Sequence, residues 1–309
     1  MSIATTQPPG IARPVRLHPK EHGAYAILGV PLVVALVLGG LNTVAVLTTI
    51  ATIAGFVANE PLMVLAGRRG ERARSTTPSA LPILGSLLLL TMLAGVAAFW
   101  LSSSTVRWTL VACALFAAAG FAMSAAGWQR SLTAQLTGII GLTLPSAAVL
   151  LAGGFDSGSV ERLSAAWIIG RVATTIAVRS VVALQKASTH HKAPRINDVL
   201  LAAAVLACVI GSVSAMRECL FIVPLVASAL FLRLRPPPIR HMRRIGYALR
   251  AANAATSVLM IGWYAGMLAE SQHAFPQQRE EKNVPCQALT KRYILRILQG
   301  KSKRPAPGS

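Results

Sequence analysis

The chain of 309 residues is 54% hydrophobic and only 13% charged, which is too few charges to cover the surface of a soluble domain of this size. It carries 30 Lys and Arg against 10 Asp and Glu, for a formal net charge of +20. The sequence has neither a zinc-finger spacing nor an aromatic platform for single strands. We therefore attribute the basicity to loops that set membrane topology and not to nucleic-acid binding.

Long apolar runs predict an all-α membrane protein. Gly, Ala and Leu fill these runs and the alternation typical of β-strands is missing, so we expect a bundle of about nine transmembrane helices. The first run is long and no clean cleavage site follows it, so we expect a retained helix and not a signal peptide. Each run comes close to the roughly 20 residues that cross a bilayer. The runs are 23–41, 43–66, 80–101, 105–126, 132–153, 163–185, 196–214, 216–232 and 245–269.

Two basic segments flank the predicted polytopic domain of residues 23–269. Residues 1–22 form a basic arm that we expect on the cytoplasmic side. Residues 270–309 form a basic tail whose Pro and Gln content predicts disorder. A short amphipathic piece at 293–298 in this tail has the charge pattern of a segment that lies on a membrane surface.

Lys and Arg concentrate in alternate connections between the predicted helices. Seventeen of them lie in the arm and in every second connection, against three in the intervening ones, Arg107, Arg162 and Arg217. Because cytoplasmic loops carry the excess of Lys and Arg, this asymmetry predicts a bacterial inner-membrane protein with a cytoplasmic amino terminus. Nine spans then place the carboxyl terminus outside, although the tail is itself rich in Lys and Arg.

Polar residues at the mouth of the first helix form the first candidate site. Glu21 and His22 precede Gly23, which permits a close approach of another backbone. An acid in the first turn of a helix is also favoured by the helix dipole, so a purely local role for Glu21 is the alternative.

A proline interrupts the second predicted helix beside an acid. Pro61 cannot donate a hydrogen bond to the carbonyl of Val57, which opens the helix where Asn59 and Glu60 lie. Arg68 follows in an arginine cluster that is typical of a topology signal, while Glu60 at membrane depth needs a partner.

The predicted helix 163–185 carries a cationic stripe. Arg171, Thr175 and Arg179 are spaced by four residues, so they fall within about 80° of one another at 100° per residue. Arg179 can extend to the cytoplasmic surface, whereas Arg171 lies about half a helix deeper. Since a charge in hydrocarbon costs at least about 2.5–3.5 kcal/mol, we expect Arg171 to pair with Glu60 or with an anionic ligand.

Cysteine and histidine spacing predicts neither a metal site nor a cofactor. Cys113 and Cys208 fall inside predicted helices, where a thiol packs as a small apolar group. If Cys219 and Cys286 both lie on the outer side, a disulfide between them is one option. No Cys-x-x-Cys motif or Cys/His pattern typical of a metal site occurs.

Three segments resemble the YwiC-like family of bacterial membrane proteins. They are PKEHGAYAILGVPLV at 19–33, ANEPLMVLAGRRGERAR at 58–74 and RVATTIAVRSVVA at 171–183, and the resemblance covers roughly residues 18–265. It implies an integral membrane protein and brings no assigned biochemical activity with it.

The predicted architecture is also similar to that of UbiA-type intramembrane prenyltransferases. Those enzymes hold Mg²⁺ on a diphosphate with two Asp-rich motifs, since this hard cation needs several carboxylate oxygens. This chain offers only Glu60 and Glu71 at the first position and no acid before Asp198 at the second. The comparison therefore implies a similar topology without magnesium-dependent prenyl transfer.

Three functions remain open from the sequence. The first is binding of an anionic lipid, an isoprenoid or a small anion in a cytoplasm-facing cavity between the first, second and sixth predicted helices. The second is an isoprenoid- or lipid-modifying transferase, and the third is a transporter, for which the Glu60–Pro61 break has no counterpart in the second half. The predicted cavity residues are Glu21, His22, Asn59, Glu60, Arg68, Arg171, Thr175 and Arg179.

Overall fold

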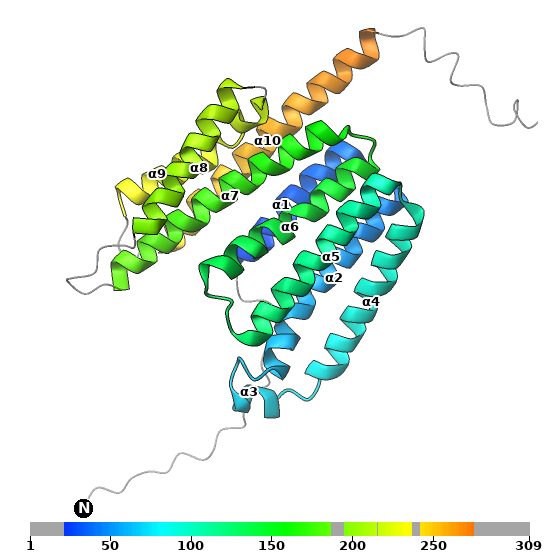
Figure 1. Cartoon of the computed structure of the whole chain (residues 1–309), viewed down its shortest axis with the longest axis vertical. Coiled ribbons are helices and arrows are strands. Elements are labelled where there is room, and N and C mark those ends of the chain that lie inside the picture. The colour runs from blue at the N-terminus through cyan, green and yellow to red at the C-terminus, as the bar shows by residue number, and fades with distance from the viewer. Residues whose placement is uncertain (1–21, 187–194, 215, 237–241, 275–309) are drawn as a thin grey trace, which may run out of the picture. The chain divides into compact units, whose positions relative to one another are not determined.

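The computed structural model describes residues 22–186, 195–214, 216–236 and 242–274, and these residues form helices and turns without any strand (Figure 1). The all-α fold is thus confirmed. Among these described residues, six helices are long and apolar enough to cross a membrane. They are α2 (Thr43–Leu65), α4 (Ala80–Leu101), α5 (Ser104–Ala126), α6 (Leu132–Ala152), α7 (Ser157–Lys186) and α8 (Arg195–Val213).

Shorter or more polar elements account for the rest of the described chain. The helix α1 (His22–Gly39) and the helix α9 (Val223–Leu234) are apolar but short, and α10 (Met242–Ala274) covers the last predicted span. Two small elements are α3 (Glu71–Ser75) and the 3₁₀ turn η1 (Arg217–Leu220). The count of nine spans stays a prediction, although each predicted segment contains a helix.

The chain divides into two compact units, Met1–Ile261 and Gly262–Ser309, and the division falls within α10. The first unit contains α1 to α9. Within it, α2 packs along α4, while α6 contacts α1, α2, α5 and α7 (Figure 1). The helix α7 packs against α8 and α9. Contacts of α6 and α7 therefore join the amino-terminal helices to the α7–α9 group.

A close approach of backbones holds α1 against α6. Gly39 and Gly153 meet so closely that a Cβ atom on Gly153 would overlap the Gly39 backbone. The Asn42 side chain donates to the carbonyl of Ala152 at 3.0 Å and accepts from the Ala45 amide at 2.8 Å, which caps α2. Small residues permit this kind of helix packing in membranes.

Large apolar side chains remain exposed on α4 and α5. Leu89 and Leu93 on α4 are 59% and 62% exposed. The most apolar stretch of α5 contains no buried residue. Trp100 and Trp108 are exposed where α4 ends and α5 begins. Because aromatic residues gather at membrane–water interfaces and lipid covers the apolar faces, these features agree with an integral multi-pass membrane protein.

Candidate functional site

The predicted site residues lie on α1, α2 and α7 and in the turn after α2. Glu21 lies outside the described residues, and His22 begins α1 with a side chain that is also outside them. Asn59 is half-buried on α2 and makes no side-chain hydrogen bond to a described residue. The remaining residues can be followed contact by contact.

Glu60 forms a bidentate ion pair with Arg69. Arg69 donates from Nε to Oε1 at 2.8 Å and from its terminal nitrogen to Oε2 at 2.7 Å. The Glu60 side chain is 1% exposed, so this pair neutralises a buried carboxylate. The predicted pair between Glu60 and Arg171 is therefore wrong, and Arg69 was missing from the predicted site.

The turn after α2 explains why Arg69 returns to Glu60. Gly67 has a φ of +72°, and its amide donates to the Val64 carbonyl at 3.1 Å. The Arg68 amide donates to the Met63 carbonyl at 3.0 Å, which completes a Schellman motif. This motif reverses the chain, so a residue nine positions after Glu60 reaches its carboxylate.

Arg68 contacts the carboxyl-terminal end of α5. Its Nε donates to the Ala125 carbonyl at 2.8 Å. A Cβ atom on Gly127, where φ is +82°, would lie 3.0 Å from the Arg68 guanidinium carbon. A cation at the carboxyl end of a helix interacts favourably with the helix dipole, so the contact explains Arg68 without a ligand.

Arg171 is the most buried of the arginines on α7. Its residue is 3% exposed, and it donates to the Ala26 carbonyl of α1 at 3.0 Å. The guanidinium carbon lies 5.2 Å from the ring centroid of Trp167, a distance typical of a cation–π contact. The buried Nε–H of Arg171 has no hydrogen-bond partner among the described residues. One strong donor thus remains unsatisfied at membrane depth.

Thr175 and Arg179 continue the stripe from Arg171. Thr175 is half-buried and its hydroxyl makes no hydrogen bond to a described residue, whereas the neighbouring Thr174 hydroxyl donates to the carbonyl of Arg171 at 3.0 Å. Arg179 donates at 3.1 Å to the carbonyl of Arg130 and at 3.0 Å to the side-chain oxygen of Gln135. The predicted helical spacing places all three on α7, and their contacts reach α1 and α6.

Three acids of the described chain pair with other arginines. Arg233 and Asp198 form a bidentate pair at 2.6 and 2.9 Å between α9 and α8. Arg162 pairs with Glu218 at 3.0 Å, and Arg69 with Glu60. Within the described ranges Arg171 makes no ion pair. It therefore differs from these three in being a buried arginine without a carboxylate.

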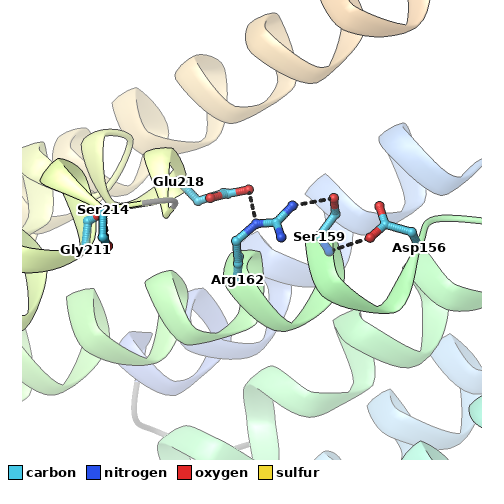
Figure 2. Close-up of polar contacts among 6 residues, drawn as sticks. All are labelled: Asp156, Ser159, Arg162, Gly211, Ser214 and Glu218. Atoms are coloured by element: carbon cyan, nitrogen blue, oxygen red, sulfur yellow. Dashed lines mark hydrogen bonds and ion pairs between the residues drawn. The ribbon is translucent and has the colours of Figure 1, made fainter.

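A separate polar network lies where α7 begins (Figure 2). Asp156 accepts a hydrogen bond from the Ser159 amide at 2.9 Å, and Arg162 donates to the Ser159 hydroxyl at 2.9 Å and to Glu218 at 3.0 Å. Hydrogen bonds from the Ser159 side chain and backbone hold the pKa of Asp156 below its ordinary value. Sequence reasoning treated these residues only as loop charges, but they connect α7 to η1.

The described part of the chain contains no group of three or more His, Cys, Asp and Glu side chains that could hold a metal ion. Helical spacing places Arg171, Thr175 and Arg179 on one side of α7, whereas Glu60 is paired with Arg69. Two guanidinium groups and a hydroxyl can donate hydrogen bonds to a phosphate or a carboxylate.

Comparison with known proteins gives one family. A family model described as YwiC-like protein matches residues 18–150, which span α1 to most of α6. No curated protein and no solved structure matches the chain. The matched segment contains the EHGA and EPL…GRRG motifs, while Arg171, Thr175 and Arg179 follow it. Residues 18–150 are thus similar to the YwiC-like family, as the two motifs in this segment predicted.

Proposed function

We propose that this membrane protein binds an anion, either a lipid headgroup or a free phosphate, against the face of α7 that carries Arg171, Thr175 and Arg179. The main support for the proposal is the buried Nε–H of Arg171, which has no hydrogen-bond acceptor among the described residues. A buried donor without an acceptor costs about 1–3 kcal/mol, and more when it is charged. An anionic oxygen removes this cost.

The contacts of Arg171 leave its charge without a counter-ion. Its bond to Ala26 and its contact with Trp167 provide a neutral carbonyl and an aromatic face, and neither compensates the full charge. Thr175 lies four residues further along α7, about 6 Å along the axis, where its hydroxyl can donate to the same group. Arg179 lies a further turn along, where it attracts anions toward the stripe.

The proposed orientation places Arg179 at the cytoplasmic end of α7, in a bacterial inner membrane. This assignment rests on the unequal distribution of Lys and Arg between alternate connections in the sequence. Reporter fusions after residue 75 and after residue 158 are expected to read cytoplasm and periplasm. The opposite readings would contradict the orientation and place the stripe at the outer end of α7.

Native mass spectrometry of the purified chain tests anion binding. We expect a bound phosphate or phospholipid in the unmodified protein, and retention about 10- to 100-fold weaker in Arg171→Gln, because a hydrogen bond to a charged group contributes about 1.5–3 kcal/mol. The mass of the bound species distinguishes a free phosphate from a lipid. Arg171→Lys keeps the charge but loses the planar donor geometry, so it is also expected to weaken retention.

Arg107 provides the matched control. This half-buried arginine of α5 donates to the carbonyls of Phe99 and Trp100 at 3.1 and 3.3 Å, so Arg107→Gln also removes an arginine bonded to a helix carbonyl. The control is expected to retain the anion. Equal retention in Arg171→Gln and Arg107→Gln, or a wild-type protein without any bound anion, would contradict the proposal. The transferase and transporter hypotheses stay predictions.

A further inference from the structure

A cysteine of α8 contacts the backbone of a cysteine in η1, and both are free thiols in this structure. The thiol of Cys208 on α8 donates to the carbonyl of Cys219 in η1 at 3.5 Å. Both residues are buried, with Cys219 at 0% and Cys208 at 5% exposure. The predicted alternative partner, Cys286, lies outside the described residues.

A glycine on α8 makes room for the second sulfur. The sulfur of Cys219 lies so close to Gly211 that a Cβ atom on this glycine would overlap it. Gly211 follows Cys208 by three residues, and residues three apart share one face of a helix. The sulfur of Cys219 is therefore packed on the same face of α8 that carries Cys208.

Neighbouring polar contacts fix the position of η1. Glu218, the residue before Cys219, pairs with Arg162 of α7, and Ser214 closes the end of α8 by donating to the Gly211 carbonyl at 3.1 Å (Figure 2). The ion pair joins η1 to α7, and η1 also packs against α8. The contact between Cys208 and the Cys219 backbone thus depends on the packing of α7, α8 and η1 as well as on proximity in sequence.

We infer that Cys208 and Cys219 form a disulfide that fastens η1 to α8 on the outer side of the membrane. The inference rests on the proposed orientation, which places the α8–α9 connection in the periplasm, where disulfides form and persist. Cys208 was predicted to pack as a small apolar residue, and the inference gives it a covalent partner instead. It also replaces Cys286 as the partner of Cys219.

The reaction consumes one disulfide of a thiol oxidase. One thiolate of the pair attacks a sulfur of the oxidase disulfide, breaks that bond and forms a mixed disulfide while the first oxidase thiol leaves. The second thiolate attacks the mixed disulfide and releases the second oxidase thiol. The chain loses two electrons, the oxidase gains them, and the two thiol protons end on the reduced oxidase.

Exchange takes place before η1 packs against α8. Burial raises the pKa of the Cys219 thiol, and negative charge on Cys208 and Glu218 raises it further. A buried thiol with a raised pKa reacts slowly because the thiolate is the nucleophile. The bond therefore forms during membrane insertion, when both cysteines are still accessible, and is protected afterwards.

Thiol counting on the full chain tests the inference. The variant Cys113→Ala/Cys286→Ala leaves only the pair, and a maleimide-polymer reagent is applied after denaturation without reductant. We expect no modified thiol before reduction and two after reduction. Adding Cys219→Ser is expected to give one modified thiol under both conditions. Peptide mass spectrometry of the unsubstituted chain should find residues 208 and 219 in one linked peptide, which avoids any folding defect of the variants.

Two free thiols before reduction, together with no linked peptide, would overturn the disulfide. A reporter fused after residue 158 separates this failure from a failure of the orientation. A periplasmic reading with two free thiols contradicts the disulfide alone. A cytoplasmic reading with two free thiols contradicts the orientation as well.

Discussion

Removal of Arg69 is expected to destabilise the protein because it leaves the Glu60 carboxylate buried without its two donors. Breaking a buried ion pair by removing one partner costs about 3–5 kcal/mol. Glu60 is 1% exposed but the Arg69 side chain is 30% exposed, so water can reach part of the pair. We therefore expect Arg69→Gln to lower the free energy of unfolding by about 3 kcal/mol, near the lower limit.

A double-mutant cycle in detergent measures the interaction itself. Unfolding by SDS titration would be followed for Glu60→Gln, Arg69→Gln and the double variant. Because both residues belong to one pair, the double variant should cost less than the sum of the single ones, by roughly 1–3 kcal/mol. This difference is the coupling free energy between Glu60 and Arg69. The effect of each substitution on other contacts cancels in it.

The same cycle with Arg171 provides the control. Glu60 and Arg171 share no contact because both oxygens of Glu60 bind Arg69, so Glu60→Gln and Arg171→Gln should add within about 0.5 kcal/mol. Additive effects for Glu60 and Arg69, or strong coupling between Glu60 and Arg171, would refute this assignment of the buried acid.

Two further substitutions test the packing of α6 and the start of α7. Gly153→Ala should destabilise by about 1–3 kcal/mol, because the new methyl group overlaps the Gly39 backbone, while Gly138→Ala, which meets nothing within 4 Å, should not; equal SDS midpoints would argue against the close approach. Asp156→Ala should lower thermal stability at neutral pH. Its pKa is held down in the folded state by Ser159, so the advantage of the acid is lost as pH falls through this lowered value, and a difference from wild type that persists in strong acid would contradict this.

Helical spans could be predicted from the sequence because apolar runs of about 20 residues form membrane-spanning helices in a bilayer. The boundaries were less accurate. The run 216–232 contains η1 and then α9 from Val223, since Pro224 favours the first turn of a helix and the preceding polar residues form a 3₁₀ turn. The predicted helix 163–185 begins earlier, at Ser157, where Asp156 accepts from the Ser159 amide.

The candidate site could be predicted only in part. Helical spacing correctly placed Arg171 and Arg179 on one helix, because that spacing is a local property. The partner of Arg171 is a carbonyl 145 residues away, which no local pattern encodes. The partner of Glu60 was encoded locally, since Gly67 after an apolar helix predicts a Schellman turn that returns Arg69 toward α2.

The most direct test of the anion site is a cryo-EM map of the protein in membrane-derived nanodiscs, at a resolution that shows side chains and bound anions. We expect density for an anionic group within hydrogen-bond distance of the Arg171 Nε, with Thr175 on the same side. A map in which a protein oxygen accepts from that Nε, or in which no density lies beside it, would contradict the proposed anion site.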